Sequence, residues 1–202
     1  MSMNGFFEFE GKRYSSGEFE LKDNKLYARA TATIRQFSDF SHISEDVLKR
    51  KGMLGTEVHK SIHEYIEGGF PFPSVQAQGY MKSFYQWEVA VNPRFLESEV
   101  RYYCDKRMLS GGVDALIKLK GKEEAILVDF KTSSQESPIT WQMQGHLYHY
   151  LLVGAGKVIS PRMLFIKLDR YGHEPTVFEY KVNSNCMNRC LEAVESFWEA
   201  HK

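Results

Sequence analysis

The chain has 202 residues, of which 43% are hydrophobic and 14% aromatic, so it can bury one substantial core. Lys and Arg number 26, as do Asp and Glu, and this zero net charge excludes a whole-molecule field that attracts DNA or an anionic membrane. The sequence has no apolar run of about 18 residues, no signal-peptide pattern at its start and too few cysteines for a disulfide framework, so we expect a cytoplasmic, reduced protein without a membrane span.

Residues 1–40 predict short β-strands. The stretches FFEFEG at 6–11 and GEFELKDNKLYARATATI at 17–34 alternate apolar and polar residues between Gly and Asn turn signals. From residue 41 the period becomes helical. One helix is predicted over 44–69, and a second over 71–91 begins among prolines and ends before Pro93.

The rest of the chain alternates strands and helices. Strands are predicted at 95–103, 109–120, 125–132, 162–169 and 176–182, and helices at 137–154 and 185–202. Ser137 and Pro138 suit the N-cap and first position of the penultimate helix. This order predicts an α/β (α+β) fold with a mixed central β-sheet flanked by helices. We expect one domain over 1–202, with N-terminal strands at 1–40, a core at 41–155, and C-terminal strands and a helix at 156–202.

The stretch GGVDALIKLKGKEEAILVDFKT, at 111–132, has the pattern of a β-hairpin. A two-residue turn at Gly121-Lys122 gives one wholly apolar face. The opposed apolar pairs on that face are Val113 with Phe130, Ala115 with Val128, and Ile117 with Ile126.

The same register places Asp114 directly opposite Asp129, with Lys131 on the same face. Opposed Cβ atoms lie about 4.5–5.5 Å apart, where two carboxylates repel unless a cation or a proton lies between them. Their oxygens suit Mg²⁺ or Mn²⁺, which keeps several waters and meets a substrate phosphate. Lys131 would orient a water or stabilise charge on a phosphoryl oxygen. The alternative to a metal site is that these charged side chains are simply exposed to solvent. Leu116 and Leu127 lie on the same face, so it is not purely a solvated one.

These residues resemble the PD-(D/E)xK nuclease superfamily. Asp114, followed after fourteen residues by Asp129-Phe130-Lys131, is similar to its D…(D/E)xK signature. Three flanking motifs resemble the RecB-like exonuclease branch, namely GTEVHKSIHEYIEG at 55–68, GGVDAL at 111–116 and WQMQGHLYHYLL at 141–152. That branch includes the RecB nuclease domain, CRISPR-associated and mitochondrial exonucleases, and phage recombination exonucleases. The resemblance implies an αβββαβ restriction-endonuclease-like core.

The resemblance also assigns roles to residues of the hairpin and the first helix. Asp114, Asp129 and the backbone carbonyl of Phe130 would be metal ligands, and Lys131 would be the catalytic lysine. His59 would be a further metal ligand or active-site residue, although a lone helical histidine at the edge of an apolar arc is often merely packed.

Three more residues are implied less directly. Gln144 and Tyr148, one helical turn apart, would line the site or contact DNA and support the catalytic strand. Without the resemblance they would be taken as ordinary helix surface and core. Glu99 is a candidate for an additional acid from the preceding strand. Glu97, two residues earlier and on the same face of that strand, is an alternative candidate for this role.

Other patterns are better explained by structure. His59 and His63 have the spacing of a zinc pair, but Lys60 between them excludes the H-E-x-x-H motif. The basic run at 49–51 could grip phosphates, and an aromatic group could stack bases, but a solvated face and core packing are the simpler explanations. That aromatic group is Phe84, Tyr85 and Trp87.

The cysteines argue against an iron–sulfur cluster of the kind that some relatives carry. A cluster of that kind needs four cysteine ligands. This chain has three cysteines, Cys104, Cys186 and Cys190. We therefore expect no iron–sulfur cluster.

The leading hypothesis is a Mg²⁺-dependent deoxyribonuclease, with Mn²⁺ as a substitute, that acts as an exonuclease on DNA ends in recombination, repair or phage DNA processing. A structure- or site-specific endonuclease of the same fold is one alternative. A catalytically silent nucleic-acid-binding or assembly module is another. The expected partners are DNA and a recombination or replication protein, with no membrane, and the protein could be phage-encoded or nucleoid-associated.

Overall fold

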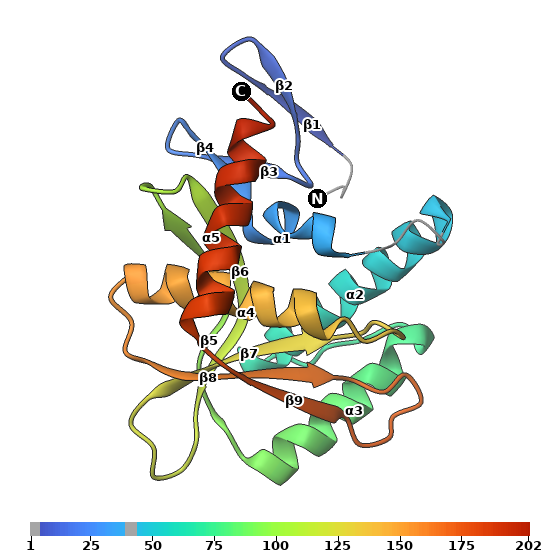
Figure 1. Ribbon diagram of the computed structural model, residues 1–202. Helices are drawn as coiled ribbons and strands as arrows, with labels where there is room; N and C mark the ends of the chain where they lie inside the picture. The colour runs from blue at the N-terminus through green and yellow to red at the C-terminus, as the bar shows by residue number, and fades with distance from the viewer. Residues whose placement is uncertain (1–4, 39–43) are drawn as a thin grey trace.

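A mixed sheet of seven strands lies at the centre of the protein (Figure 1), in a computed structural model that describes residues 5–38 and 44–202. Its strands are β3 Phe19–Lys22, β4 Lys25–Arg29, β5 Arg94–Cys104, β6 Leu109–Lys118, β7 Ala125–Lys131, β8 Ile159–Lys167 and β9 Thr176–Lys181. The spatial order is β3-β4-β6-β7-β8-β9, and β5 pairs with β6. β4 with β6 and β7 with β8 are parallel, and the other pairs are antiparallel. The predicted mixed sheet is confirmed.

Helices cover both faces of this sheet. They are α1 Ala30–Thr33, α2 Glu45–Ile66, α3 Val75–Val91, α4 Pro138–Gly154 and α5 Ser184–Glu199. α4 and α5 pack on one face through a core cluster that includes Leu147 and Val194, and α2 and α3 pack on the other through Val58 and Phe84. The order α2, β5, β6, β7, α4, β8 contains the predicted αβββαβ arrangement, with α3 inserted after α2. Among the helices of the described residues, none has the length and apolarity that a bilayer crossing requires.

The N-terminal region is only partly the run of strands that alternation predicts. β1 Phe6–Phe9 and β2 Lys12–Ser15 form a separate two-stranded sheet, visible beside the end of α5 in Figure 1. The prediction of strand up to residue 34 is wrong, because Ala30–Thr33 is α1 and Arg35–Phe37 is a 3₁₀ turn. The helical turn lets Ala30 and Ile34 share one buried face in the α4–α5 cluster, so core packing overrides the strand preference of the threonines. The predicted change of period near residue 41 lies outside the described residues.

The hairpin keeps its predicted register but not its predicted turn or faces. Ala115 pairs with Val128 and Ile117 with Ile126. The connection spans 119–124, and its turn is closed by the Lys122 N–H donating to the Leu119 carbonyl, which places the turn one residue earlier than predicted. Both faces are buried.

Val113 departs from the predicted apolar face. It packs toward α4, whereas Ala115 packs toward α2 and α3. The alternation therefore breaks at Asp114, which lies beyond the paired residues of the β6–β7 ladder.

A buried histidine fixes α4 against the start of α5. His146 is fully buried; its Nδ1 lies 2.8 Å from the Gln142 carbonyl, and its Nε2 accepts a hydrogen bond from the Asn183 N–H at 3.0 Å. Asn183 is in turn the N-cap of α5, and its side chain accepts from the Cys186 N–H. Burial lowers the pKa of His146, and also that of the neighbouring His149, so both imidazoles are held neutral.

We expect stability to fall in mild acid because of His146. The unfolded chain takes up a proton at about pH 6.5, whereas the folded imidazole resists protonation, so this stability is complete above about pH 6.5 and is lost below it. His146→Gln keeps an acceptor for the Asn183 N–H but cannot be protonated. Between pH 8 and pH 5.5 the melting temperature of the wild type should fall further than that of the variant, by on the order of 2–4 °C. Parallel curves for the two proteins would contradict this role.

Candidate active site

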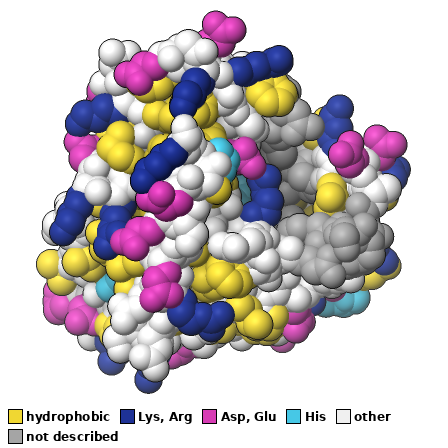
Figure 2. Space-filling model, turned by 45° about the horizontal axis from the view of Figure 1, so that its top comes forward, with side chains coloured by type: hydrophobic (Ala, Val, Ile, Leu, Met, Phe, Trp, Pro, Cys, Tyr) yellow, Lys and Arg dark blue, Asp and Glu magenta, His cyan; other side chains and the backbone are white. Residues whose placement is uncertain are grey.

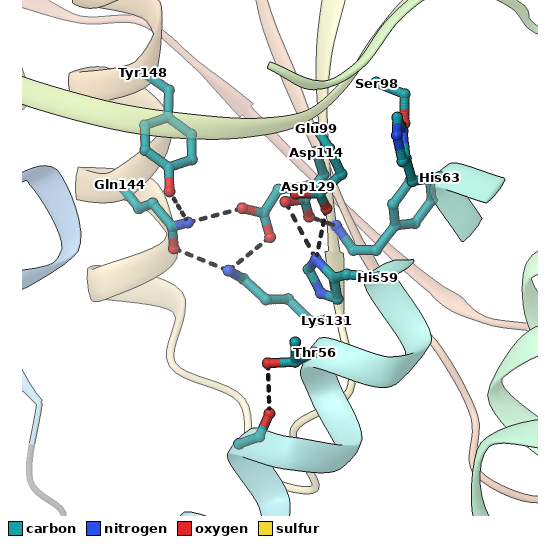
Figure 3. Close-up of polar contacts among 12 residues, drawn as sticks. Thr56, His59, His63, Ser98, Glu99, Asp114, Asp129, Lys131, Gln144 and Tyr148 are labelled. Carbon is teal, nitrogen blue, oxygen red and sulfur yellow. Dashed lines mark hydrogen bonds and ion pairs between the residues drawn. The ribbon is translucent and has the colours of Figure 1, made fainter. Parts of the chain in front are cut away.

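Seven polar side chains from five elements converge in one region of the structure (Figure 3). α2 carries His59, β5 carries Glu99, β6 carries Asp114, β7 carries Asp129 and Lys131, and α4 carries Gln144 and Tyr148. All seven were singled out by the sequence. The pairing of β6 with β5 and with β7, and the packing of α2 and α4 on the sheet, bring them together from positions that span 90 residues of chain, 59 to 148.

His59, Glu99 and Asp114 form a three-residue cluster that could hold a metal ion. The Nδ1 atom of His59 lies 3.3 Å from Oδ1 of Asp114 and 3.5 Å from Oε1 of Glu99. One ligand atom from each residue lies within 4.8 Å of the other two. The side chains are 26%, 39% and 12% exposed for His59, Glu99 and Asp114, so the cluster opens to solvent on the Glu99 side. We call it the HED cluster.

Glu99 reaches the HED cluster through an unusual backbone conformation. Its φ is +53°, a region that non-glycine residues seldom adopt and that is often found at functional sites. The ladder between β5 and β6 pairs Ser98 with Ala115 and Val100 with Val113, so Glu99 and Asp114 lie together between these pairs.

The structure shows which of Glu97 and Glu99 lies at the HED cluster. The alternation of side chains along the strand could not decide between them, because both residues are expected on the same face. Glu97 is bound by the Lys157 ammonium and the Tyr102 hydroxyl. These contacts lower the pKa of Glu97 against the opposing effect of its burial. Glu97 is thus engaged in an ion pair of its own, and Glu99 is the acid that faces His59.

We expect Glu99→Gln to weaken divalent-metal binding by at least about tenfold, because it removes one of the two carboxylates of the HED cluster. Glu97→Gln is the matched control, since it makes the same chemical change two residues away on the same strand. It should leave metal binding within about twofold of wild type, consistent with a role outside the site. Titration with Mn²⁺ measures both variants. Equal losses in the two would show that Glu99 is not a ligand.

A second group of contacts links Asp129, Lys131 and α4. Lys131 Nζ lies 2.6 Å from Oδ2 of Asp129 and donates to Oε1 of Gln144 at 2.9 Å. Gln144 Nε2 donates to Oδ1 of Asp129 at 2.8 Å and lies 2.9 Å from the Tyr148 hydroxyl. Tyr148 and Asp129 are 5% and 1% exposed, respectively. The amide of Gln144 therefore fixes the carboxylate and the ammonium relative to each other.

The electrostatics of the site reflect three acids held close together. Burial raises the pKa of the Asp129 carboxyl to about 7, against the opposing charge of Lys131 and with added repulsion from Asp114. Burial also opposes ionisation of Asp114, but His59, Lys131 and the Phe130 N–H lower its pKa. Burial would lower the pKa of His59, yet its contacts with Asp114 and Glu99 hold that pKa well above its usual range. The two acids thus favour a positive charge on the imidazole of His59.

The donor atoms of the HED cluster fit a divalent cation. Imidazole nitrogen and carboxylate oxygens are ligands of Mn²⁺, and the carboxylates are ligands of Mg²⁺. Oδ2 of Asp129 is buried and accepts no hydrogen bond from any residue of the described chain, although it lies next to Lys131. Phe130 donates its N–H to Oδ2 of Asp114 at 2.7 Å, a contact that orients this carboxylate. A metal role for Asp129 and for the Phe130 carbonyl stays a prediction.

Glycines let the two covering helices approach the catalytic strands. A Cβ at Gly111 on β6 would lie 2.8 Å from Cε1 of Tyr148 and from Cδ1 of Leu151, which is too close for any side chain. A Cβ at Gly55 on α2 would lie 3.1 Å from Oγ1 of Thr132, just after β7. Both glycines belong to motifs that the sequence analysis singled out.

The remaining sequence candidates lie in structural positions. His63 Nδ1 lies 3.1 Å from the Ser98 hydroxyl. Phe84 and Trp87 are buried in the α2–α3 core, as expected, and Tyr85 packs against that core. From the basic run, Lys51 donates to the Ser134 hydroxyl at 3.0 Å.

Neither a family model nor a curated protein matches this sequence. Similar solved structures include a protein named SSO0001, with 16% identity, a TM-score of 0.49, and coverage of 88% of this chain and 78% of that one. An alkaline exonuclease, LHK-Exo from Laribacter hongkongensis, has 8% identity, a TM-score of 0.47, and coverage of 86% and 87%. LHK-Exo in complex with dAMP gives 9% identity, a TM-score of 0.48 and the same coverage. At these identities and scores the likenesses carry no information about substrate or chemistry.

Proposed function

We propose that the protein is a divalent-metal-dependent DNA nuclease that hydrolyses phosphodiester bonds, acting as an exonuclease at DNA ends in recombination, repair or phage DNA processing. The observation that carries this proposal is the position of the HED cluster beside the Asp129–Lys131 ion pair. The choice of DNA ends depends on the resemblance of the motifs to the RecB-like branch. DNA is the proposed partner, with a recombination or replication protein as a second.

His59, Glu99 and Asp114 would hold the metal, with Asp129 beside them. Mg²⁺ or Mn²⁺ supplies charge neutralisation at a scissile phosphate and lowers the pKa of a water, which are the two effects that phosphodiester hydrolysis needs most. Without a cation, the acids of the site repel a phosphate, so the residues present favour a metal-loaded working state.

Lys131 is held in position to act on the reacting phosphate group. Its ammonium is fixed by the Asp129 carboxylate and the Gln144 amide, while its side chain remains 17% exposed. Fixed in this way, it can orient the attacking water or stabilise the negative charge that develops on a phosphoryl oxygen. Tyr148 holds Gln144 and so acts as a positioning residue for this lysine.

The test is digestion of linear duplex DNA, labelled at either the 5′ end or the 3′ end of one strand, with Mg²⁺ or with EDTA. A nuclease releases label only with the metal, and the end whose label is released first gives the polarity. A covalently closed circle of the same sequence separates the alternatives, because an exonuclease leaves it intact and an endonuclease does not. If linear, circular and single-stranded DNA all survive in Mg²⁺ and in Mn²⁺, the catalytically silent module becomes the better explanation.

A further inference from the structure

A second charged cluster lies near the HED cluster. On β5, two residues after Glu99, Arg101 places Nη1 2.8 Å from Oε2 of Glu20 on β3. Arg29, the last residue of β4, places Nη2 3.4 Å from the same oxygen. Two guanidinium groups therefore converge on one carboxylate oxygen. No local pattern in the sequence predicts this cluster, because Arg101 follows Arg29 only after a long stretch of chain.

This cluster carries one more positive charge than negative. Burial lowers the pKa of Arg29, repulsion from Arg101 lowers it further, and Glu20 opposes both effects. The Glu20 side chain is 12% exposed, whereas those of Arg29 and Arg101 are 28% and 42% exposed. Both arginines thus keep part of their surface available to an anion from outside, and the acid that joins them is the most enclosed member. Burial and then the charge of Glu20 raise the pKa of the Tyr103 hydroxyl.

Arg101 lies within a short distance of the residues proposed to hold the metal. It pairs with Gly112, and a Cβ on Gly112 would lie 3.8 Å from its Cζ, so the guanidinium covers this glycine. Gly112 precedes Asp114 by two residues, which is about 6.6 Å along a strand. Burial raises the pKa of the Tyr148 hydroxyl, and the charge of Arg101 opposes this rise.

This separation along the backbone is of the same order as the spacing of phosphates in a nucleic-acid strand. Successive phosphates of one DNA strand advance about 3.4 Å along the helix axis. A strand with its scissile phosphate at the HED cluster therefore has another phosphate one or two nucleotides away, near Arg101. On the face in Figure 2, basic side chains are interspersed with acidic ones, so phosphate contacts have to be made by local groups of this kind.

We propose that Arg29 and Arg101 bind a DNA phosphate next to the one that is cleaved, and that the Glu20 carboxylate occupies this phosphate site when DNA is absent. The inference depends on the proposed function, because it takes the substrate to be DNA. Planar guanidinium groups bind carboxylate and phosphate in the same two-pronged manner, so one anion can replace the other. DNA binding then has to displace Glu20 from at least one arginine, and this competition lowers the affinity.

The decisive experiment measures the binding of a fluorescent duplex by anisotropy, with Ca²⁺ in place of Mg²⁺ and with gels to verify that the DNA stays uncut. Glu20→Gln should bind about threefold or more tightly than wild type, because the competing charge is gone. Arg101→Ala should bind about fivefold more weakly and should reduce the slope of log K against log salt by about 1. Duplexes with a 5′-phosphate or a 5′-hydroxyl distinguish a terminal phosphate from an internal one, since only a terminal site responds to the difference.

Matched controls come from the far edge of the sheet. Arg162 on β8 and Glu179 on β9 form a one-to-one ion pair through Nη2 and Oε2 at 2.7 Å. Glu179→Gln and Arg162→Ala make the same chemical changes and should leave DNA affinity and the salt slope unchanged. Thermal melting of every variant verifies folding. If Glu20→Gln is unfolded, Glu20→Asp, which shortens the acid by one carbon, should also bind more tightly than wild type.

Two outcomes would overturn the inference. If wild type binds and cleaves DNA while the Glu20 and Arg101 variants behave like the controls, the cluster only joins β3, β4 and β5, and the proposed function stands. If Arg101→Ala weakens binding but Glu20→Gln does not strengthen it, Glu20 does not compete with DNA. Failure of the proposed function itself has another signature, namely that the wild type cleaves no DNA with Mg²⁺ or Mn²⁺.

Discussion

Lys131→Ala is expected to lower the rate of DNA cleavage by about 10²–10³-fold, the usual effect of removing one group that stabilises charge in a transition state. The ammonium is fixed by Asp129 and Gln144, so it acts from a set position, and a smaller side chain leaves nothing there to replace it. Metal binding should be retained, because the lysine is a cation near the HED cluster and not one of its ligands. Single-turnover cleavage of end-labelled duplex measures the rate, and Mn²⁺ titration measures the metal.

Lys167→Ala is the matched control for this lysine. Lys167 is the register partner of Lys131 on the neighbouring parallel strand β8, and its Nζ lies 2.9 Å from Oε1 of Glu136. The two side chains are similarly exposed, at 17% and 23%. Cleavage by the Lys167 variant should stay within about threefold of wild type, as expected for a surface ion pair. A comparable loss in both variants would point to general weakening of DNA contact rather than to a catalytic lysine.

Asp114→Asn is expected to abolish divalent-metal binding while leaving the fold intact. The asparagine oxygen can still accept the Phe130 N–H, but one of the two anionic ligands of the HED cluster is lost. A metal at about 100 times its Kd stabilises the folded protein by about 2.7 kcal/mol, and for a chain of this size each kcal/mol raises the melting temperature by about 2–4 °C. Saturating Mn²⁺ should therefore raise the melting temperature of the wild type by several degrees and leave that of the variant unchanged.

Asp105→Asn provides the control for a general charge effect. Asp105 also lies in a polar contact, with Lys25 and with the Tyr27 hydroxyl, but no metal-binding group was found around it in the described residues. Its variant should show the full Mn²⁺-induced rise in melting temperature.

Cleavage by the Asp114 variant should fall to background in Mg²⁺. If instead Mn²⁺ raises the melting temperature of Asp114→Asn as much as that of wild type, the metal lies elsewhere.

The hairpin illustrates how far a local pattern can predict structure. Apolar alternation correctly paired Ala115 with Val128, because shifting the register by one residue would turn every apolar side chain to the wrong face. Alternation could not predict the break at Asp114, where Val113 turns toward α4. At this break, Asp114 on β6 and Glu99 on β5 lie between the same two pairs of the β5–β6 ladder. His59 on α2 contacts both carboxylates.

The sequence by itself determined the order of elements after residue 44, the register of the hairpin and the identity of the chemical groups, since these depend on periodicity and spacing within short segments. Tertiary structure decided which groups meet. Glu97 and Glu99 are two residues apart on one strand, so alternation gives them the same face. In the structure Glu97 contacts Lys157 and Tyr102, whereas Glu99, with its φ of +53°, lies beside His59. The Arg29–Arg101–Glu20 contact likewise exists only because β4 pairs with β6 in parallel and β5 joins that strand. Ion pairs between distant segments follow from the topology of the sheet, which no local period encodes.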